Sequence, residues 1–594
     1  MPVPRALSSR ADVAVVASLC AFGAAIRVTG LTSRDLWFDD SWAALPAHVS
    51  LHDALRMVVT TPLYTLAMRT WIGVLPQDTW WAQLPALVLG VAGIAAVWAL
   101  VRAHGYSRLA AFVAAAIVAA GPITVMYATR VKEYPADLLL ACLVLWLVDR
   151  WRRAPSTRLL TVLAVASIAA LWISASTAAV VGGAAATAIL VAWSRPEVRR
   201  HVAAYLGALF IGAGSVWVVF LRRLPGQLRT NWRTHGFLFG YSSARHVAYE
   251  FQQSFAGIAH GLIGIPIAYT FQGFALRAWP MALAVIAVTV LVTLVAPPLV
   301  HAIRTMGAGS SPMTASAAAI AIAVLGTLAG LAPFGDGRTD EALYPAILLL
   351  GAGAVHSLST RLAVPALLQR TGRAARSGSA VAVARLLGAA SAESYVQSMS
   401  TPESLRRTGR ATFAGLVAVG AIWFGVTHLA EYPPTGLRTI YAELKPLLRH
   451  GDLVVVDGYE QFTWGDEGLT PWRVSFVQGA VPWPMGFHVA SEDPSVDLSP
   501  EYLQPDPTLA GLVARAARVW FIGPTVGGYS TSAPTDLWPL QDPTPTWREL
   551  ECPSHLEKPT STCPVSGLGL QRKTFFEYSG TYAQLYVHPS HRHP

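Results

Sequence analysis

Apolar runs long enough to cross a lipid bilayer recur between residues 11 and 430 of this chain. A helix needs about 20 mostly apolar residues to span the hydrocarbon core. By this measure the chain is predicted to be a polytopic α-helical membrane protein with about eleven transmembrane helices. They are expected near 11–30, 83–102, 108–127, 135–149, 158–175, 177–194, 201–221, 278–300, 313–332, 343–358 and 411–430.

The first apolar run follows two basic residues, Arg5 and Arg10, as the hydrophobic segment of a signal peptide does. The run is long, however, no small-residue cleavage site is evident, and further spans follow it. We therefore interpret it as a retained first helix with its N-terminus inside the cell.

The segment 62–76 is apolar but short, and Arg69 interrupts it. If it does not cross, the arginines between the later spans fall inside, together with the basic loop 359–410. If it crosses, the cluster at 150–153 moves outside, against the positive-inside tendency. We therefore assign 31–82 to an outer loop in which 62–76 is an interfacial amphipathic helix. An odd number of spans then places the C-terminus outside.

The C-terminal region, 431–594, has a different character from residues 1–430. It carries 11 basic and 18 acidic side chains, whereas residues 1–430 carry 33 and 16. Amphipathic stretches alternate with strand-like runs such as DLVVVDG, ARVWFIG and YAQLYVH. This pattern predicts a soluble α/β domain. Cys552 and Cys563 lie close together in it, which favours a disulfide and an extracytoplasmic location.

The overall composition supports the membrane assignment. Charged residues make up 13% of the chain and the mean hydropathy is +0.44, whereas soluble proteins have roughly 25% charged residues. The composition excludes a soluble enzyme and a disordered chain. A nucleic-acid binder is disfavoured because the arginines lie in short loops between apolar runs.

An adjacent carboxylate pair, Asp39 and Asp40, follows the first predicted helix. The simplest interpretation is a solvated helix end, or a cap in which Asp40 or Ser41 starts the next helix. The pair is nevertheless flanked by the interfacial aromatic side chains Trp37 and Trp42, and it faces the side predicted for the soluble domain. We therefore take Asp39 and Asp40 as catalytic candidates.

Two further outer loops carry candidate binding residues. The loop YATRVKEYPAD places Arg130 and Lys132 on the outer side, where basic residues are unusual and could hold a phosphate instead of anchoring the interface. Its Asp137 falls within a predicted span, where a carboxylate is costly and usually paired. In the loop PFGDGRTDEALYP, Arg338 offers a weaker candidate, since a glycine turn with solvated charges also explains it.

These segments resemble the GT-C class of integral-membrane glycosyltransferases, in the branch of protein O-mannosyltransferases and lipid A aminoarabinose transferases. That branch has an Asp-Glu pair after the first helix, a Pro-Pro-Leu-Tyr-like segment and a Ser/Tyr-x-x-Arg-x-x-x-Tyr loop. The matching residues are Asp39–Asp40, Thr61–Tyr64 and Tyr127–Tyr134, and the resemblance extends over about 11–358. Asp40 replaces the usual Glu, and Thr61 the first proline.

The resemblance implies a polyprenyl-phosphate-linked sugar as donor and inverting transfer to an acceptor hydroxyl at the outer face. By position Asp39 would be the base, although the Asp-for-Glu change leaves Asp39 and Asp40 as alternatives. Arg130, Lys132 and Arg338 would stabilise the leaving phosphate. The matching motifs also add Tyr64 and Tyr134, which with Asp137 would contact the substrate.

The implied partners are the lipid-linked donor, an envelope glycan, lipid or protein acceptor, and membrane lipid, with no nucleic acid. No cofactor is assigned. The acidic residues show no metal-ligand spacing, yet a divalent metal is left open. The expected location is the cytoplasmic membrane, in a bacterium. Two alternatives remain: a flippase or transporter of a lipid-linked sugar, and a non-catalytic envelope-assembly protein.

Overall fold

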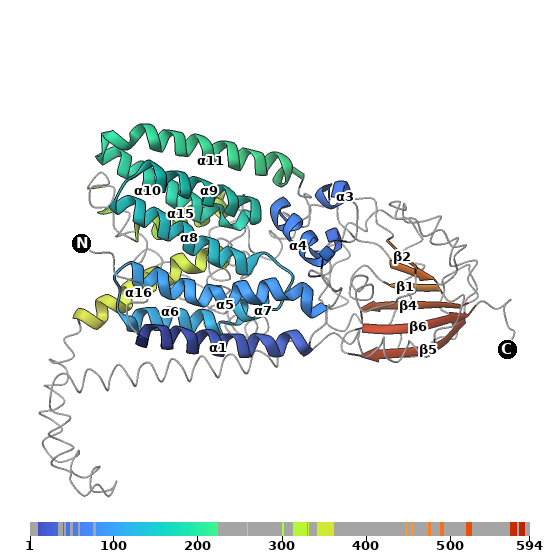
Figure 1. The fold of residues 1–594 in the computed structure, drawn as a ribbon. Helices are drawn as coiled ribbons and strands as arrows, with labels where there is room; N and C mark the ends of the chain where they lie inside the picture. Colours follow the sequence, from blue (N-terminus) through green and yellow to red (C-terminus); the bar gives the residue numbers. More distant parts are fainter. Residues whose placement is uncertain are drawn as a thin grey trace, which may run out of the picture.

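A computed structural model describes the chain in two parts, a helical bundle and the strands of a C-terminal sheet (Figure 1). The longer described stretches of the helical part are 10–33, 60–74, 79–223, 313–329 and 341–361. Shorter stretches are 43–47 and 51–56, with the single residues 40, 258, 300, 301, 304, 331 and 447, and the six strands given below. All structural statements that follow concern these residues.

The described helices coincide with nine of the predicted spans. They are α1 (Arg10–Ser33), α5 (Thr79–Ala103), α6 (Arg108–Ala120) with α7 (Pro122–Tyr127), α8 (Tyr134–Arg153), α9 (Thr157–Ile173), α10 (Ala178–Ser194), α11 (Arg199–Val219), α15 (Thr314–Leu328) and α16 (Tyr344–Arg361). Among the described residues, four helices are long and apolar enough to cross a membrane by length and composition. The predicted span at 278–300 apart from residue 300, the span at 411–430, and the loop at 359–410 beyond Arg361 lie outside the described residues.

The predicted span at 108–127 is two helices instead of one. It breaks at Gly121, whose backbone is extended (φ −60°, ψ 131°). The cause is Pro122, because proline has no N–H to donate within a helix and disfavours helical backbone in the residue before it. Helix α7 then starts with Pro122 in its first turn, where proline is well tolerated.

The bundle core is formed by buried aliphatic and aromatic side chains around α5 and α8. Ile94, Trp98, Leu145 and Trp151 are among its almost fully buried members. Helix α5 packs against α1, α6 and α8, and α10 packs against α15. The long helices run side by side (Figure 1). Because short turns join α5 to α6 and join α8, α9, α10 and α11 in series, these consecutive helices point in opposite directions.

This alternation collects the arginines at one end of the bundle. They lie at the end of α5, the start of α6, the end of α8, and around the turn from α10 to α11. They are Arg102, Arg108, Arg150, Arg152, Arg153, Arg195, Arg199 and Arg200. The end of α1, α7 and the start of α8 lie at the opposite end (Figure 1). The arginine end is the one predicted to face the cytoplasm, and that orientation remains a prediction.

Three short helices lie near the opposite end: η1 (Leu45–Ala47), α3 (Leu51–Arg56) and α4 (Pro62–Val74). Helix α4 falls within the predicted amphipathic segment. Its buried face is formed by Tyr64, Met68 and Ile72, which recur every four residues. These side chains pack with Ala43 and Val131, so α4 rests on the loop that follows α7.

The C-terminal region contains a six-stranded mixed sheet. Its strands are β1 (Leu453–Val456), β2 (Arg473–Phe476), β3 (His488–Ser491), β4 (Arg518–Pro524), β5 (Gln571–Tyr578) and β6 (Thr581–Val587), in the order β2-β3-β1-β4-β6-β5. Strands β1 and β4 pair in parallel and the other neighbours are antiparallel. Strands β1, β4 and β6 fall on the three predicted strand motifs.

The sheet lies beyond the end of the bundle that carries α3 and α4 (Figure 1). The predicted helices of the C-terminal region and the cysteines Cys552 and Cys563 lie outside the described residues. The complete α/β domain, the disulfide and the extracytoplasmic location therefore remain predictions.

Candidate active site

A buried ion pair joins two of the residues singled out by sequence, Asp40 and Arg130. Arg130 Nη1 lies 3.0 Å from Asp40 Oδ2, and the two side chains are 10% and 1% exposed. The backbone N–H of Val131 donates to Asp40 Oδ1 at 2.9 Å. Both carboxylate oxygens of Asp40 are thus engaged by the loop after α7.

The loop is shaped by local hydrogen bonds. The N–H groups of Thr129 and Arg130 donate to the carbonyls of Met126 and Tyr127 at 3.0 and 3.2 Å. The Thr129 hydroxyl also donates to Met126, at 2.8 Å. These tight turns close α7 and direct the next residues, Arg130 and Val131, toward Asp40.

The same loop buries Lys132 and leads into α8. Lys132 is only 8% exposed. Tyr134, the first residue of α8, packs edge-to-face against Tyr127, with ring centroids 4.7 Å apart. The two tyrosines of the sequence motif thus contact each other across the two ends of the loop that carries Arg130 and Lys132.

Asp137 lies in the first turn of α8 and is fully buried. Its Oδ2 accepts a hydrogen bond of 2.5 Å from the Ser176 hydroxyl, and Ser176 lies 2.7 Å from the Ser174 hydroxyl. Both serines belong to the break between α9 and α10. Asp137 Oδ1 has no hydrogen-bond partner among the described residues, so this oxygen retains its capacity to accept.

Tyr64 of α4 is buried beside three carboxylates. Burial raises the pKa of the Tyr64 phenol well above its ordinary value near 10, and the charges of Glu133, Asp40 and Asp137 raise it further. The phenol therefore stays protonated and retains an O–H donor. Tyr64 connects α4 electrostatically to both the Asp40 and the Asp137 parts of the site.

A fourth carboxylate, Glu341, was not among the predicted site residues. It starts the short helix η5 (Glu341–Leu343) before α16 and is 1% exposed. It interacts electrostatically with Asp137 and with Arg27 of α1. One signal was present in the sequence for Arg27, because a charge inside an apolar run is rare. Glu341 lies in the same sequence segment as Arg338, but nothing in the sequence distinguished it from the other charged residues there.

The structure brings together several of the predicted residues. Asp40 contacts Arg130 directly, Tyr64 interacts with Asp40 and Asp137, and Lys132 and Tyr134 share the loop of Arg130. Asp39 and Arg338 lie outside the described residues. Within the part of the chain that the structure describes, no group of three or more His, Cys, Asp or Glu is arranged to hold a metal ion.

Comparison with known proteins gives a fold likeness and no sequence match. No protein-family model matches the chain, and no curated protein matches its sequence. A crystal structure of ArnT from Cupriavidus metallidurans bound to undecaprenyl phosphate matches with a TM-score of 0.51 at 13% identity, covering 96% of this chain and 97% of that one. The apo structure of the same enzyme matches with a TM-score of 0.49 at 14% identity, over 86% and 93%.

The likeness to the lipid-bound structure is one of fold. ArnT is an aminoarabinose transferase of the GT-C class, the branch to which the sequence motifs pointed. The chain is thus a multi-pass membrane protein with a GT-C-like fold.

Proposed function

We propose that this chain is a membrane glycosyltransferase that transfers a sugar from a polyprenyl-phosphate carrier to an acceptor hydroxyl at the outer face of the membrane. The observation that carries the proposal is the buried Asp40–Arg130 pair. It orders a loop with two cations, Arg130 and Lys132, which leads directly into α8 and its buried Asp137. The ArnT-like fold, seen in a protein bound to undecaprenyl phosphate, supports the same donor class.

The loop is suited to binding the phosphate of a donor. A guanidinium presents five N–H donors in a fixed fork, so an arginine that pairs with a carboxylate can also bind a phosphate oxygen. Lys132 adds a second positive charge close by in the chain. As the bond between the anomeric carbon and the phosphate oxygen breaks, negative charge grows on the phosphate, and these cations stabilise it. Arg338 is proposed as a third.

The base is assigned to Asp39, and the reason lies in what Asp40 does. Both carboxylate oxygens of Asp40 are already engaged, one by Arg130 and the other by the Val131 N–H. The proposed role of Asp40 is therefore to position Arg130. Asp39 would take the proton from the acceptor hydroxyl as that oxygen attacks the anomeric carbon from the face opposite the phosphate, which inverts the configuration.

Asp137 and Tyr64 are proposed to contact the sugar. The Oδ1 atom of Asp137 can accept from a sugar hydroxyl, and the neutral phenol of Tyr64 can donate to a sugar oxygen. A lipid phosphate is a good leaving group, so the scheme requires no general acid.

The test is sugar transfer by the full-length protein in detergent or nanodiscs, with undecaprenyl-phosphate-linked sugars as donors. Mass spectrometry of cell-envelope glycans and glycoproteins, with and without the chain, would first identify the sugar and the acceptor. Asp39→Asn is expected to abolish transfer while expression and undecaprenyl phosphate binding stay near wild type. Full transfer by this variant would overturn the assignment of Asp39.

The same assay separates the alternative functions. A flippase would move the lipid-linked sugar across the membrane without forming a new glycoside. A non-catalytic assembly protein would act through its C-terminal domain. Transfer that persists after truncation near residue 430 would argue against that possibility, and a donor that is never consumed would contradict the proposed enzyme.

A further inference from the structure

Arg27 of α1 is a fully buried cation inside the helical bundle. Its guanidinium donates to the carbonyls of Ala119 at 2.8 Å, Val118 at 2.9 Å and Thr124 at 3.2 Å. It also donates to Gly23 of its own helix at 3.0 Å. One side chain thus binds the last turn of α6, the following helix α7, and α1.

The bound carbonyls lie where the backbone ladder is interrupted. In a continuous helix, residue 122 would donate to the carbonyl of Val118, but Pro122 has no N–H. A buried carbonyl without a donor is costly. The Thr124 hydroxyl supplies a second donor, at 2.7 Å to Val118 and 2.9 Å to Gly121. Arg27 and Thr124 together stabilise the break between α6 and α7.

The helices pack closely around Arg27. A Cβ atom added at Gly23 would lie 2.4 Å from Ile94 Cδ1 and 3.0 Å from Arg27 Nη1, and one added at Gly90 would lie 2.5 Å from the Cβ of Ala128 and 3.5 Å from Arg27 Nε. Glycine at both positions therefore lets the guanidinium and the end of α7 approach their neighbouring helices closely.

The position of Arg27 connects the two halves of the Asp40–Arg130 pair. Helix α1, which carries Arg27, precedes Asp40, and α7, which Arg27 binds through Thr124, leads into the loop of Arg130. A third segment joins them, because Glu341 interacts electrostatically with Arg27. The rigid, forked guanidinium of Arg27 lets one side chain contact α1, α6 and α7 at once.

We propose that Arg27 is a positioning residue for the donor phosphate: it fixes α1 against the α6–α7 break and so sets the geometry in which Asp40 holds Arg130. This inference rests on the proposed function. If it is correct, perturbing Arg27 or Thr124 weakens phosphate binding specifically through Arg130. A role confined to general stability would instead lower the amount of folded protein and leave the binding of the folded fraction unchanged.

The test is the dissociation constant for undecaprenyl phosphate, measured on full-length protein that elutes as a single species. Arg27→Lys keeps the charge but loses the fork, and is expected to raise Kd about tenfold. Arg130→Ala is expected to raise it to a similar degree. The double variant should bind no more weakly than Arg130→Ala alone, because both changes remove the same interaction. Independent, multiplicative effects would overturn the proposal.

A second pair of variants, at Thr124, tests the same proposal if Arg27→Lys does not fold. Thr124→Val removes the hydroxyl that donates to the Val118 carbonyl, which Arg27 also binds, and to the Gly121 carbonyl. It is expected to raise Kd about threefold to fivefold. Thr124→Ser keeps the hydroxyl and should bind near wild type. Wild-type binding by Thr124→Val overturns the proposal, whether or not Arg27→Lys folds.

The measurements separate failure of this inference from failure of the proposed function. If the wild type does not bind undecaprenyl phosphate, or if Arg130→Ala binds as tightly as the wild type, the proposed phosphate role of Arg130 is wrong. If Arg130→Ala weakens binding while Arg27→Lys and Thr124→Val do not, only the positioning role of Arg27 is wrong.

Discussion

Asp40 and Arg130 come from opposite ends of a long stretch of sequence, and the structure joins them in a buried ion pair of 3.0 Å. The neighbouring Val131 amide binds the other oxygen of Asp40. The carboxylate that follows the first helix thereby orders the cationic loop that follows α7. This arrangement relates the two most informative motifs of the sequence, and the first prediction tests it.

Breaking the pair from one side should destabilise the protein strongly. Arg130→Met leaves Asp40 as a buried charge without its cation, which typically costs about 3–5 kcal/mol. The double variant Asp40→Leu with Arg130→Met should lose less than the sum of the two single variants. Unfolding of the purified protein, followed by tryptophan fluorescence, measures this. Strict additivity would show that the two side chains do not interact.

Tyr64→Phe should impair transfer with little effect on folding, since the ring remains and only the O–H donor is lost. A drop of about tenfold in kcat/KM corresponds to roughly 1.4 kcal/mol, within the range of one hydrogen bond. Because its raised pKa keeps the phenol neutral, the loss should be the same at pH 7 and pH 9. Tyr106→Phe, at the arginine end of the bundle, is the control and should transfer normally.

Ser176→Ala should lower the stability of the protein, because Asp137 loses the hydroxyl that donates to it. The substitution removes the donor to a buried carboxylate oxygen, at a cost of about 1–3 kcal/mol. Ser176→Thr retains a hydroxyl and should recover most of the loss. The melting temperature and the KM for the donor report the effect. Equal values for Ala and wild type would mean that the contact does not hold Asp137 in place.

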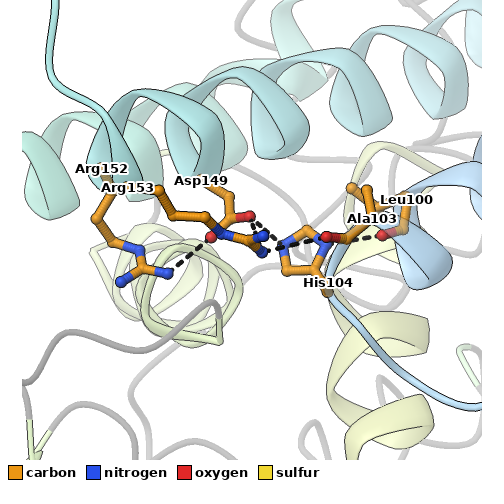
Figure 2. Close-up of polar contacts among 6 residues, drawn as sticks. All are labelled: Leu100, Ala103, His104, Asp149, Arg152 and Arg153. Carbon is orange, nitrogen blue, oxygen red and sulfur yellow. Dashed lines mark hydrogen bonds and ion pairs between the residues drawn. The ribbon is translucent and has the colours of Figure 1, made fainter. Parts of the chain in front are cut away.

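Stability should fall on acidification because of His104, in the turn between α5 and α6. Its Nδ1 lies 2.7 Å from the Leu100 carbonyl, and Nε2 lies 3.7 Å from Asp149, which also pairs with Arg152 and Arg153 (Figure 2). Burial lowers the pKa of His104 from its ordinary 6.5, despite the opposing charge of Asp149.

The sign follows from proton binding in the two states. Between the lowered pKa of the folded protein and about pH 6.5, the unfolded chain binds more protons at this histidine than the folded protein does. The free energy of unfolding should therefore decrease as the pH falls from 7.5 toward 5. In His104→Asn this decrease should be smaller, whereas His201→Asn, at an exposed position, should retain it. Thermal unfolding across this pH range is the measurement, and parallel curves for His104→Asn and wild type would contradict it.

Helix packing should depend on Gly183 and not on Gly207. A Cβ atom at Gly183 of α10 would lie 2.8 Å from the Ala319 backbone nitrogen of α15, whereas nothing lies within 4 Å of one at Gly207. Gly183→Ala should destabilise by about 1–3 kcal/mol through overpacking. Gly207→Ala should be neutral or stabilising by up to about 1 kcal/mol. Unfolding midpoints compare them, and equal values would contradict the close approach.

The sequence by itself determined the class of the protein and much of its element order. Apolar runs located the described long helices because a span must be apolar over its whole length. The strand-like runs DLVVVDG, ARVWFIG and YAQLYVH located β1, β4 and β6. The break at Gly121 was present in the sequence as a Gly-Pro pair, but the apolar run continues through it, so hydropathy predicted one helix where backbone chemistry makes two.

Only the tertiary structure decided how the candidate site is assembled. Sequence motifs selected Asp40, Arg130 and Asp137 individually, and none of them indicated that Asp40 binds the loop of Arg130 or that Ser176 binds Asp137. The contacts that Arg27 and Glu341 make were likewise visible only in the structure. The physical reason is that hydrophobic periodicity reports which face of a helix is buried, whereas contacts between distant segments depend on how the helices pack and where their breaks expose polar backbone groups.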